Sequence, residues 1–338
     1  MRTRPVGRTA LRVTELGFGG AGLGELFELV SEPDAQATLE AAWSAGVRYF
    51  DTAPWYGHGL SEHRIGHFLR QKSRADYVLS TKAGRVYTAK GRESTFDGAP
   101  WVGGLDFELR FDYTRSGILR SYEDSLQRFG ISRVDILNVH DLDPLYHGEE
   151  GVAGRLDELD AGGGFGALEE LKSAGVIGAI GAGINELGMI PRFLERFDLD
   201  LFVVAMPYTL LDQEALDVEL PACSARGVGV VVGAPFASGV LATGPNAEAK
   251  YAYATPPTEV TARVERMRGI AAAFGVSLIG AALQFPLGHP SVCAVIPGAT
   301  AAHQVIQNTD AFARAIPPDF WKALRDQGLI RADAPLPA

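Results

Sequence analysis

Four ionisable side chains of different types stand where the chain could bring them together. Asp51, Lys82 and His140 each come directly after an apolar run typical of a buried strand, and Tyr56 follows Asp51 in the next loop. The carboxyl ends of neighbouring parallel strands meet at one edge of a sheet, so we expect these side chains to share one site. Such a combination of acids and bases predicts a proton-transfer site.

The chemistry that this set favours is that of an acid–base tyrosine. A free tyrosine has a pKa of about 10 and is a poor base near neutrality. A lysine ammonium beside it favours the phenolate and lowers that pKa, and an aspartate can hold the lysine in place. We therefore expect Tyr56 to exchange a proton with a substrate oxygen as hydride leaves or arrives, and His140 to orient that oxygen.

Each of these residues alone has a simpler explanation. An aspartate after a strand is often a turn residue or a helix cap, and a single lysine is usually solvated. The prediction depends on their conjunction, because Asp51, Lys82 and His140 follow three successive strand-like runs of this type.

The elements that must position these residues alternate between short apolar runs and helical patterns. The apolar runs are continuous, as in strands that are covered on both faces. They predict strands at Leu16–Gly19, Val47–Phe50, Tyr77–Thr81, Val134–Val139, Ile177–Gly181, Leu201–Ala205, Val228–Val232 and Ser291–Ile296. The intervals predict helices at Asp34–Ala45, Ser61–Arg70, Arg115–Phe129, Gly166–Ala174, Leu187–Arg196, Gln213–Arg226, Glu259–Phe274 and Ala301–Ala313. Several end at a glycine, a frequent helix stop: Gly46, Gly130, Gly175 and Gly227.

This alternation predicts an α/β protein with a parallel sheet, and the number of units favours closure into a (β/α)8 TIM barrel. We expect residues 1–338 to form a single domain. Arg2–Val13 predicts an N-terminal hairpin that plugs the barrel floor. Long loops follow strand ends at the carboxyl face, and their length is typical of functional or disordered segments, with mobile decoration as the alternative. They are Gly84–Tyr113, Asp141–Gly163 and Gly233–Pro257.

Composition and charge narrow the classes of partner. The 338 residues carry a formal net charge of -10, which leaves no basic face for a nucleic acid. We find no apolar stretch long enough for a membrane span and no signal segment, so we expect a cytoplasmic protein that acts on a small molecule. Cys223 and Cys293 match no metal or disulfide pattern and are interpreted as reduced thiols. The sequence leaves the oligomeric state open.

A longer motif around Asp51 carries a family resemblance. The segment GVRYFDTAPWYG at residues 46–57, followed by Ser61-Glu62 and Ile65-Gly66, resembles the signature of the aldo-keto reductase superfamily. Ser80-Thr81-Lys82 and Asn138-Val139-His140-Asp141 fall where that family places its lysine and histidine. The resemblance runs from about Val13 to Asn308. It implies a barrel oxidoreductase with a nicotinamide cofactor and a catalytic tetrad of Asp51, Tyr56, Lys82 and His140.

The resemblance also implies cofactor contacts in the second half of the chain. Asn185 falls where the family holds the nicotinamide amide, although Gly183 replaces the usual serine nearby. The segment from Ala234 resembles the loop over the pyrophosphate, and the segment from Ile296 resembles the adenosine site. The cofactor-binding candidates are Asn185, Tyr208, Ala234, Pro235, Phe236, Ser238, Gly239, Leu241, Pro297, Gly298, Ala299, Thr300, Gln304 and Asn308.

Two of these positions bear on the choice of dinucleotide. Members that prefer NADP(H) usually carry a lysine and an arginine facing the 2′-phosphate, where this chain has Gly298 and Gln304. A phosphate is best bound by charge-assisted donors, and these two positions supply none. The resemblance therefore implies NAD rather than NADP, unless an arginine or lysine from another loop takes their place.

Within the superfamily, Phe111–Arg115 and Tyr208–Gln213 resemble the branch of D-threo-aldose (L-fucose) 1-dehydrogenases and pyridoxal 4-dehydrogenase. Both kinds of substrate present a cyclic hemiacetal whose anomeric hydroxyl can be oxidised to a lactone. The branch implies NAD-dependent oxidation of an aldose of the L-fucose or D-arabinose type, or of pyridoxal. We expect Trp55, Trp101 and Tyr146 to line the substrate pocket. An NADPH-dependent aldehyde or ketone reductase and a non-catalytic dinucleotide-binding regulatory subunit stay open as alternatives.

Two other patterns are weaker. Gly17–Gly22 fits G-x-G-x-x-G, but no helix is expected before Asp34, so we interpret it as a glycine-lined floor of the active-site mouth rather than a Rossmann loop. His58, His63 and His67 lack the carboxylates or cysteines that would complete a zinc site. We predict no metal.

Overall fold

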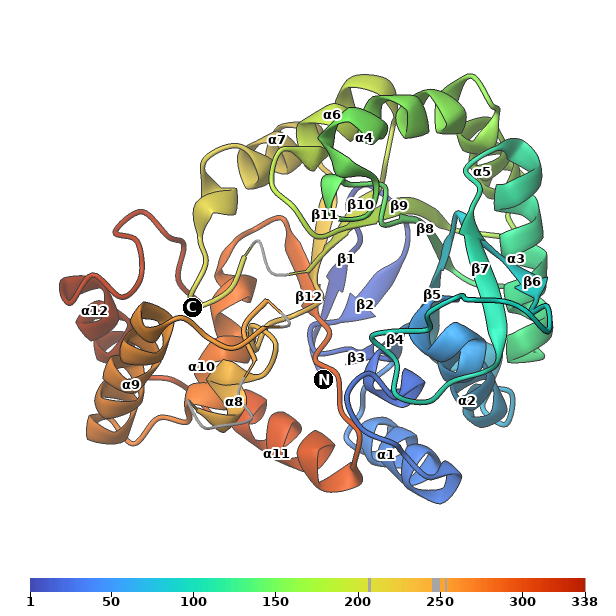
Figure 1. Ribbon diagram of the computed structural model, residues 1–338. Coiled ribbons are helices and arrows are strands. Elements are labelled where there is room, and N and C mark those ends of the chain that lie inside the picture. The colour runs from blue at the N-terminus through green and yellow to red at the C-terminus, as the bar shows by residue number, and fades with distance from the viewer. Residues whose placement is uncertain (206–207, 245–249, 253, 338) are drawn as a thin grey trace.

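Eight parallel strands form the centre of the computed structural model, which describes residues 1–205, 208–244, 250–252 and 254–337. Neighbouring strands follow the order β12-β11-β10-β9-β8-β5-β4-β3. Parallel bridges from Leu16 to Val295 and from Gly19 to Gly298 join the two outer strands, so the sheet closes into a barrel (Figure 1). The strands are β3 (Phe18–Gly19), β4 (Tyr49–Asp51), β5 (Val78–Ala83), β8 (Ile136–His140), β9 (Ala179–Ile184), β10 (Leu201–Val204), β11 (Gly229–Val232) and β12 (Val292–Val295).

Helices surround the barrel as an outer ring (Figure 1). They are α1 (Glu32–Ser44), α2 (Leu60–Leu69), α3 (Arg115–Phe129), α4 (Pro144–Asp160), α5 (Gly164–Ser173), α6 (Met189–Arg196), α7 (Glu219–Arg226), α8 (Val240–Thr243), α9 (Thr258–Ala273), α10 (Leu278–Gln284), α11 (Ala302–Ala313) and α12 (Pro318–Asp326). The predicted (β/α)8 fold and its eight strands are confirmed. The four stop glycines all have positive φ, as that role requires.

One predicted helix is wrong in its extent, and α10 is among the helices that were not predicted. The segment Gln213–Arg226 is a short 3₁₀ turn followed by α7, which begins only at Glu219. Pro221 cannot donate a backbone hydrogen bond, so it is accommodated in the first turn of a new helix. Helix α10 is apolar along almost its whole length and therefore has no stripe of helical period that would mark it.

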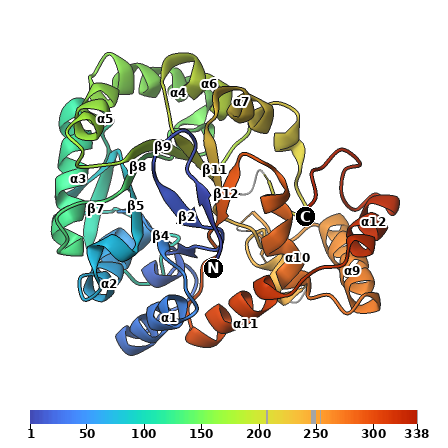
Figure 2. The same ribbon diagram turned by 180° about the vertical axis from the view of Figure 1, so that it is seen from behind.

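The N-terminal hairpin covers one opening of the barrel, as predicted (Figure 2). Strands β1 (Thr3–Pro5) and β2 (Arg12–Thr14) pair antiparallel. Val6 and Val13 are buried among the side chains that fill the barrel interior. The hairpin therefore closes the amino-terminal side of the barrel and leaves the carboxyl ends of the strands to the loops.

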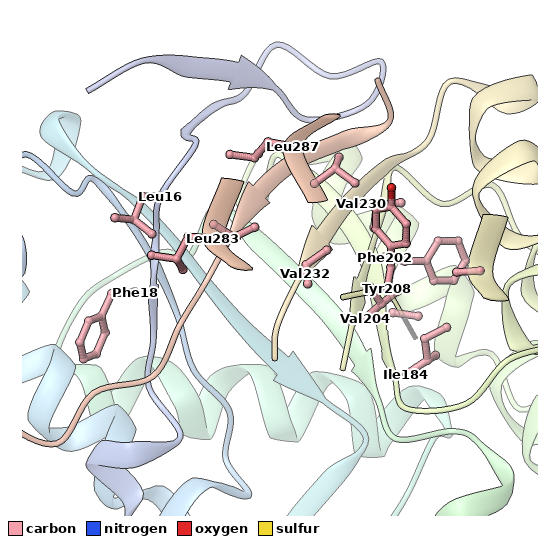
Figure 3. Close-up of a cluster of buried hydrophobic side chains, with 14 of the residues drawn as sticks. Leu16, Phe18, Ile184, Phe202, Val204, Tyr208, Val230, Val232, Leu283 and Leu287 are labelled. Atoms are coloured by element: carbon pink, nitrogen blue, oxygen red, sulfur yellow. The ribbon is translucent and has the colours of Figure 1, made fainter. Parts of the chain in front are cut away.

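Apolar side chains fill two layers, one on each face of the strands. The inner layer includes Tyr49, Ile136 and Val231, whereas the alternate residues pack outward against the helices. Figure 3 shows part of that outer layer, with Phe202, Val204, Val230 and Val232 labelled. Because both faces are buried, the strands appear in the sequence as continuous apolar runs. The two cysteines are buried and free, as expected.

The long loops contain more regular structure than the sequence indicates. Residues 84–113 form a hairpin of β6 (Arg85–Ala89) and β7 (Phe107–Phe111). Most of residues 141–163 form α4, which is broken at Gly148. This helix is rich in glycine, so its weak propensity hid a stripe of buried Val152, Leu156 and Leu159. Within 233–257, α8 forms, and residues 245–249 and 253 lie outside the described residues.

Within the described ranges, no single helix is long and apolar enough to cross a membrane. Helices α9 and α10 with the turn after α10 pass that test only as a pair, and the pair is bent by 105°.

The packing of α2 on α3 leads to a stability prediction. A Cβ atom at Gly66 would lie 2.3 Å from the Phe129 carbonyl oxygen, which is backbone and cannot turn aside. We expect Gly66→Ala to lower the free energy of unfolding by about 1–3 kcal/mol, measured by denaturant titration. Gly154→Ala in α4 is the matched control, since its Cβ would meet no atom within 4 Å. The control should be neutral or stabilising by about 0.5–1 kcal/mol; equal losses in both variants would contradict this account.

Candidate active site

Neighbouring strands place three of the four predicted residues at one rim of the barrel. Asp51 ends β4, Lys82 lies near the end of β5 and His140 ends β8. These strands are adjacent and parallel, and Lys82 pairs with Asn138 in their register. Tyr56 opens a short 3₁₀ turn just after β4. The barrel therefore brings the four residues together, as predicted.

Close backbone contacts fix the turn that carries Tyr56. Gly57 has φ of 62°, and a Cβ there would lie 2.5 Å from the carbonyl oxygen of Gly24. The carbonyl of Gly57 accepts a hydrogen bond of 3.0 Å from the amide of Leu105. Glycine is required here, because two other loops meet the backbone of this turn directly.

Lys82 and Asp51 form a buried ion pair. Lys82 Nζ donates to Asp51 Oδ1 at 2.7 Å and to the Thr52 carbonyl at 2.8 Å, and both charged side chains are only 2% exposed. Ser80 Oγ donates to Asp51 Oδ2 at 2.7 Å, and Asn138 Nδ2 donates to Ser80 Oγ at 2.9 Å. The lysine is thus held by hydrogen bonds that its buried charge needs.

The ring of Tyr56 lies close to both the lysine and the histidine. Lys82 Nζ is 4.9 Å from the centroid of the tyrosine ring. The ring centroids of Tyr56 and His140 are 6.0 Å apart, and those of Tyr56 and Trp101 are 5.6 Å apart. A cation at this distance favours negative charge on the phenol, so the arrangement is suited to moving a proton on and off Tyr56.

His140 is a neutral imidazole at neutral pH. Burial lowers its pKa well below the usual range; Asp141 opposes this shift, and the positive charges of Lys82 and Arg85 add to it. Its Nε2 lies 3.3 Å from Asp141 Oδ2, and its Nδ1 is buried without a hydrogen-bond partner in the described part of the chain. A neutral imidazole can orient a substrate oxygen without competing with Tyr56 for the proton.

A cavity of about 380 Å³ opens above these residues. All four predicted catalytic side chains line it, and so do the predicted substrate-pocket residues Trp55, Trp101 and Tyr146. Three further wall residues were not predicted: Leu26 between β3 and α1, Pro100 between β6 and β7, and Leu145 at the start of α4. No local sequence signal marks them, since they are apolar residues that become neighbours only through the fold.

One side of the cavity is built to accept a bulky group against backbone. Its wall contains Gly19, Gly20, Gly183, Gly233 and Gly298, which put no side chain into the space. A Cβ at Gly183 would lie 3.3 Å from Lys82 Cε, so a larger residue would press on the ion pair. The arrangement fits a nicotinamide ring bound beside Lys82, with Asn185 on the same wall.

The other predicted cofactor residues are distributed around this wall. Ala234 and Gly298 line the cavity. Outside the cavity lining, Pro235, Phe236, Ser238 and Gly239 form a turn that leads into α8, and Leu241 lies within that helix. Pro297, Ala299 and Asn308 line a small gap behind β3.

Tyr208 lies away from the cavity. It is fully buried beside Phe285 and His289 and belongs to the core layer shown in Figure 3. Burial raises the pKa of its hydroxyl above the ordinary tyrosine value.

Thr300 and Gln304 form a small polar cluster with an acidic loop residue. The Gln304 side-chain oxygen accepts from the Thr300 amide at 2.9 Å, and Thr300 Oγ1 donates to Glu28 Oε1 at 2.7 Å. The cluster presents a carboxylate and no positively charged group among these three residues.

The two weaker sequence patterns have structural roles. After Gly17–Gly22 no α-helix begins until Glu32, and Gly19 and Gly20 line the cavity, as the interpretation as a mouth floor predicts. His58 packs against Trp55, and its Nδ1 lies 3.0 Å from the Leu105 carbonyl oxygen. In the described parts of the chain, no group of three or more histidine, cysteine, aspartate or glutamate side chains is placed to hold a metal ion.

A (β/α)8 barrel with these four residues at its carboxyl rim defines a class of oxidoreductase, and sequence comparisons agree. Residues 15–327 match the aldo/keto reductase family. The chain is 42% identical over 335 residues to pyridoxal 4-dehydrogenase of Microbacterium luteolum, with 97% of each chain covered. It is 39% identical over 333 residues to D-threo-aldose 1-dehydrogenase of a Pseudomonas species, with 97% of this chain and 98% of that protein covered.

A solved structure, the holo form of an aldo-keto reductase from Bacillus halodurans, matches with a TM-score of 0.74 at 25% identity, covering 99% of this chain and 98% of the other. The chain therefore belongs to the aldo/keto reductase family, whose members are oxidoreductases with nicotinamide cofactors.

Burial of neutral His140 leads to a pH prediction. A histidine whose pKa is depressed in the folded state binds its proton more readily when unfolded, at about 6.5. Its stabilising effect is therefore present above that pH and is lost as pH falls toward the lower folded pKa. We expect the thermal unfolding midpoint, Tm, to decrease as the pH is lowered from 7 to 5. This decrease should be smaller in His140→Gln.

Other partly buried histidines, including His58 and His289, also have lowered pKa values and act in the same direction. The test therefore compares how steeply Tm changes with pH in His140→Gln and in the unchanged protein, measured by thermal unfolding at several pH values. Exposed His67→Gln is the control. A pH slope in His140→Gln as steep as that of the unchanged protein would contradict the assignment of a neutral buried His140.

Proposed function

We propose that this protein oxidises the anomeric hydroxyl of a cyclic hemiacetal to a lactone, with NAD as hydride acceptor. The observation that carries the proposal is the placement of Tyr56 beside a buried Lys82–Asp51 ion pair at the floor of an aromatic-walled cavity. The names of the two relatives, a pyridoxal dehydrogenase and an aldose dehydrogenase, support it. Pyridoxal and aldoses of the L-fucose or D-arabinose type share the hemiacetal group that this chemistry requires.

The residues divide the proton transfer between them. Tyr56 takes the proton of the anomeric hydroxyl as the C–H bond at the same carbon breaks. Lys82 stabilises the phenolate that accepts this proton, and Asp51 keeps Lys82 in place. His140 donates a hydrogen bond to the substrate oxygen. A nicotinamide dinucleotide bound along the glycine-lined wall supplies the acceptor for the hydride.

The cavity walls support a substrate with flat or C–H-rich faces. Trp55 and Trp101 meet edge to face with ring centroids 5.7 Å apart, and Tyr146 lies on the same cavity. Aromatic faces suit the C–H surface of a sugar ring and the plane of a pyridine ring alike. The rings thus favour a cyclic substrate form over an extended one.

The charges near the adenosine segment support NAD over NADP. Gly298 and Gln304 replace the cations expected for a 2′-phosphate, and the Gln304 side chain is tied to the Thr300 amide. Glu28 adds a negative charge through its hydrogen bond with Thr300. A ribose hydroxyl can donate to a carboxylate, whereas a phosphate beside it is repelled.

The function is tested by following NADH absorbance with NAD+ and NADP+ in parallel, using pyridoxal, L-fucose, D-arabinose and L-galactose. We expect NAD-dependent oxidation of at least one of them. Tyr56→Phe removes the proton acceptor and should lower kcat by about 10²–10⁴-fold. Its affinity for NAD+, measured by fluorescence quenching, should stay within about twofold. Turnover in Tyr56→Phe like that of the unchanged protein, or rapid NADPH-dependent aldehyde reduction with no oxidation, would overturn the proposal.

A charge change at the adenosine segment should alter cofactor preference. We expect Gly298→Lys with Gln304→Arg to improve NADP+ binding by about 10-fold or more, since each substitution adds a charge-assisted donor. Adding Glu28→Gln should improve it further by removing repulsion. Dissociation constants for NAD+ and NADP+ measured by calorimetry provide the test, with Gln307→Arg on the same helix as control. If the triple variant binds NADP+ no better than the unchanged protein, the 2′-hydroxyl of the cofactor's adenosine ribose does not lie beside residues 298 and 304.

A further inference from the structure

Asp141 directly follows the predicted catalytic histidine and has an unusual backbone conformation. Its φ is 52°, in the left-handed region that residues other than glycine rarely adopt. The residue is 5% exposed, and its amide donates to the Gly183 carbonyl at 3.0 Å. A buried residue is held in such a conformation only where its surroundings fix it, and such positions cluster at functional sites.

The carboxylate of Asp141 connects two residues of the site. One oxygen, Oδ2, lies 3.3 Å from His140 Nε2, and the other, Oδ1, accepts from Asn185 Nδ2 at 3.0 Å. Burial opposes ionisation of Asp141, but its contacts with His140 and Arg85 outweigh this and lower the pKa of the carboxyl. The group therefore carries a negative charge between the predicted substrate-orienting histidine and the predicted nicotinamide-binding asparagine.

Arg85, at the start of β6, holds this carboxylate in place. Its Nη2 donates to Asp141 Oδ2 at 2.6 Å, and the two side chains are 5% and 7% exposed. The guanidinium also lies over three aromatic rings, at 4.4 Å from the centroid of Trp55, 4.3 Å from that of Phe111 and 4.6 Å from that of Tyr146. The planar cation is thus fixed both by its ion pair and by ring contacts.

We propose that Asp141, anchored by Arg85, is a positioning residue that keeps the proton of neutral His140 on Nε2 and holds Asn185 against the cavity wall. A carboxylate close to Nε2 favours the tautomer with its proton on that nitrogen. His140 and Asp141 both line the cavity, and their 3.3 Å separation is long for a hydrogen bond, so an incoming substrate oxygen can share the Nε2 proton with Asp141 or replace it as acceptor. Arg85 rests on Trp55 and Tyr146, so the pair also connects the substrate walls with the proton-transfer residues.

This inference rests on the proposed function for its kinetic part, but its first test does not depend on turnover. Asp141→Asn removes the charge and retains a residue type that tolerates positive φ. We expect ¹⁵N-histidine spectra of the protein without substrate to show His140 as the Nε2–H tautomer, and to show loss of that preference in Asp141→Asn. The His140 signals are assigned by their absence in His140→Gln.

The second test separates binding from chemistry. We expect Asp141→Asn to lower kcat on the order of 10²-fold, because a misplaced hydrogen-bond donor is costly in the reaction. Its Kd for NAD+ should rise by much less than kcat falls, because Asn185 loses its bond to Asp141 but keeps two bonds of 2.9 Å to Asp143, and KM should change little. Asp106→Asn, which breaks the exposed pair with Lys90, is the matched control and should leave all three values unchanged.

Removal of one partner of a buried ion pair destabilises a protein, so a second variant keeps the test decisive. Arg85→Gln leaves Asp141 charged but unanchored and should cause a smaller fall in kcat with the tautomer of His140 retained. If Asp141→Asn does not fold, Arg85→Gln is judged by its kcat. The proposal is overturned if the folded Asp141→Asn protein keeps the wild-type His140 tautomer, or if kcat in the variant that folds stays within twofold of wild type. Failure of the unchanged protein to oxidise any hemiacetal would instead refute the proposed function.

Discussion

Lys82 can be charged inside the barrel only because Asp51 is beside it, and the rest of the site depends on this contact. Both side chains are almost fully buried, where either charge alone would be strongly destabilising. The supporting groups come from three adjacent strands and the residue after one of them: Asp51, Thr52, Ser80 and Asn138. A shift of one residue in strand register would turn Lys82 toward the helices, so the pair forms only in the correct barrel.

The barrel strands carry the predicted proton-transfer residues Asp51, Lys82 and His140, whereas the loops supply much of the cavity wall. Glu25 shows how a loop wall is fixed. Its carboxylate pairs with buried Arg64 at 3.1 Å and accepts from the amide of Gly104, while its backbone carbonyl accepts from the amide of Val102. These contacts tie the segment that carries Trp101 to the helix that follows Tyr56. The wall and the floor of the cavity are therefore held together by polar contacts between segments that are far apart in the sequence.

Electrostatic balance around the site follows from the same packing. Arg85 and Lys82 are both cations near His140, and each has its own buried carboxylate, Asp141 and Asp51. The pairing keeps two positive charges close to one neutral imidazole without leaving either charge uncompensated. Under the proposed function, a substrate oxygen would meet a site whose charges are already fixed by the protein, which is the arrangement that stabilises developing charge at low reorganisation cost.

Much of this arrangement could be predicted from the sequence, because local patterns mark it. Continuous apolar runs identified the eight strands, and the polar residue after a run identified Asp51, Lys82 and His140. Glycines and weak propensity hid α4, and uniform apolarity hid α10. By itself the sequence determined the fold class and the floor of the site, since strand period and residue type are local properties. Only the tertiary structure decided the remaining wall residues, such as Leu26 and Pro100, and the contacts of Asp141, because these depend on packing between segments far apart in the chain.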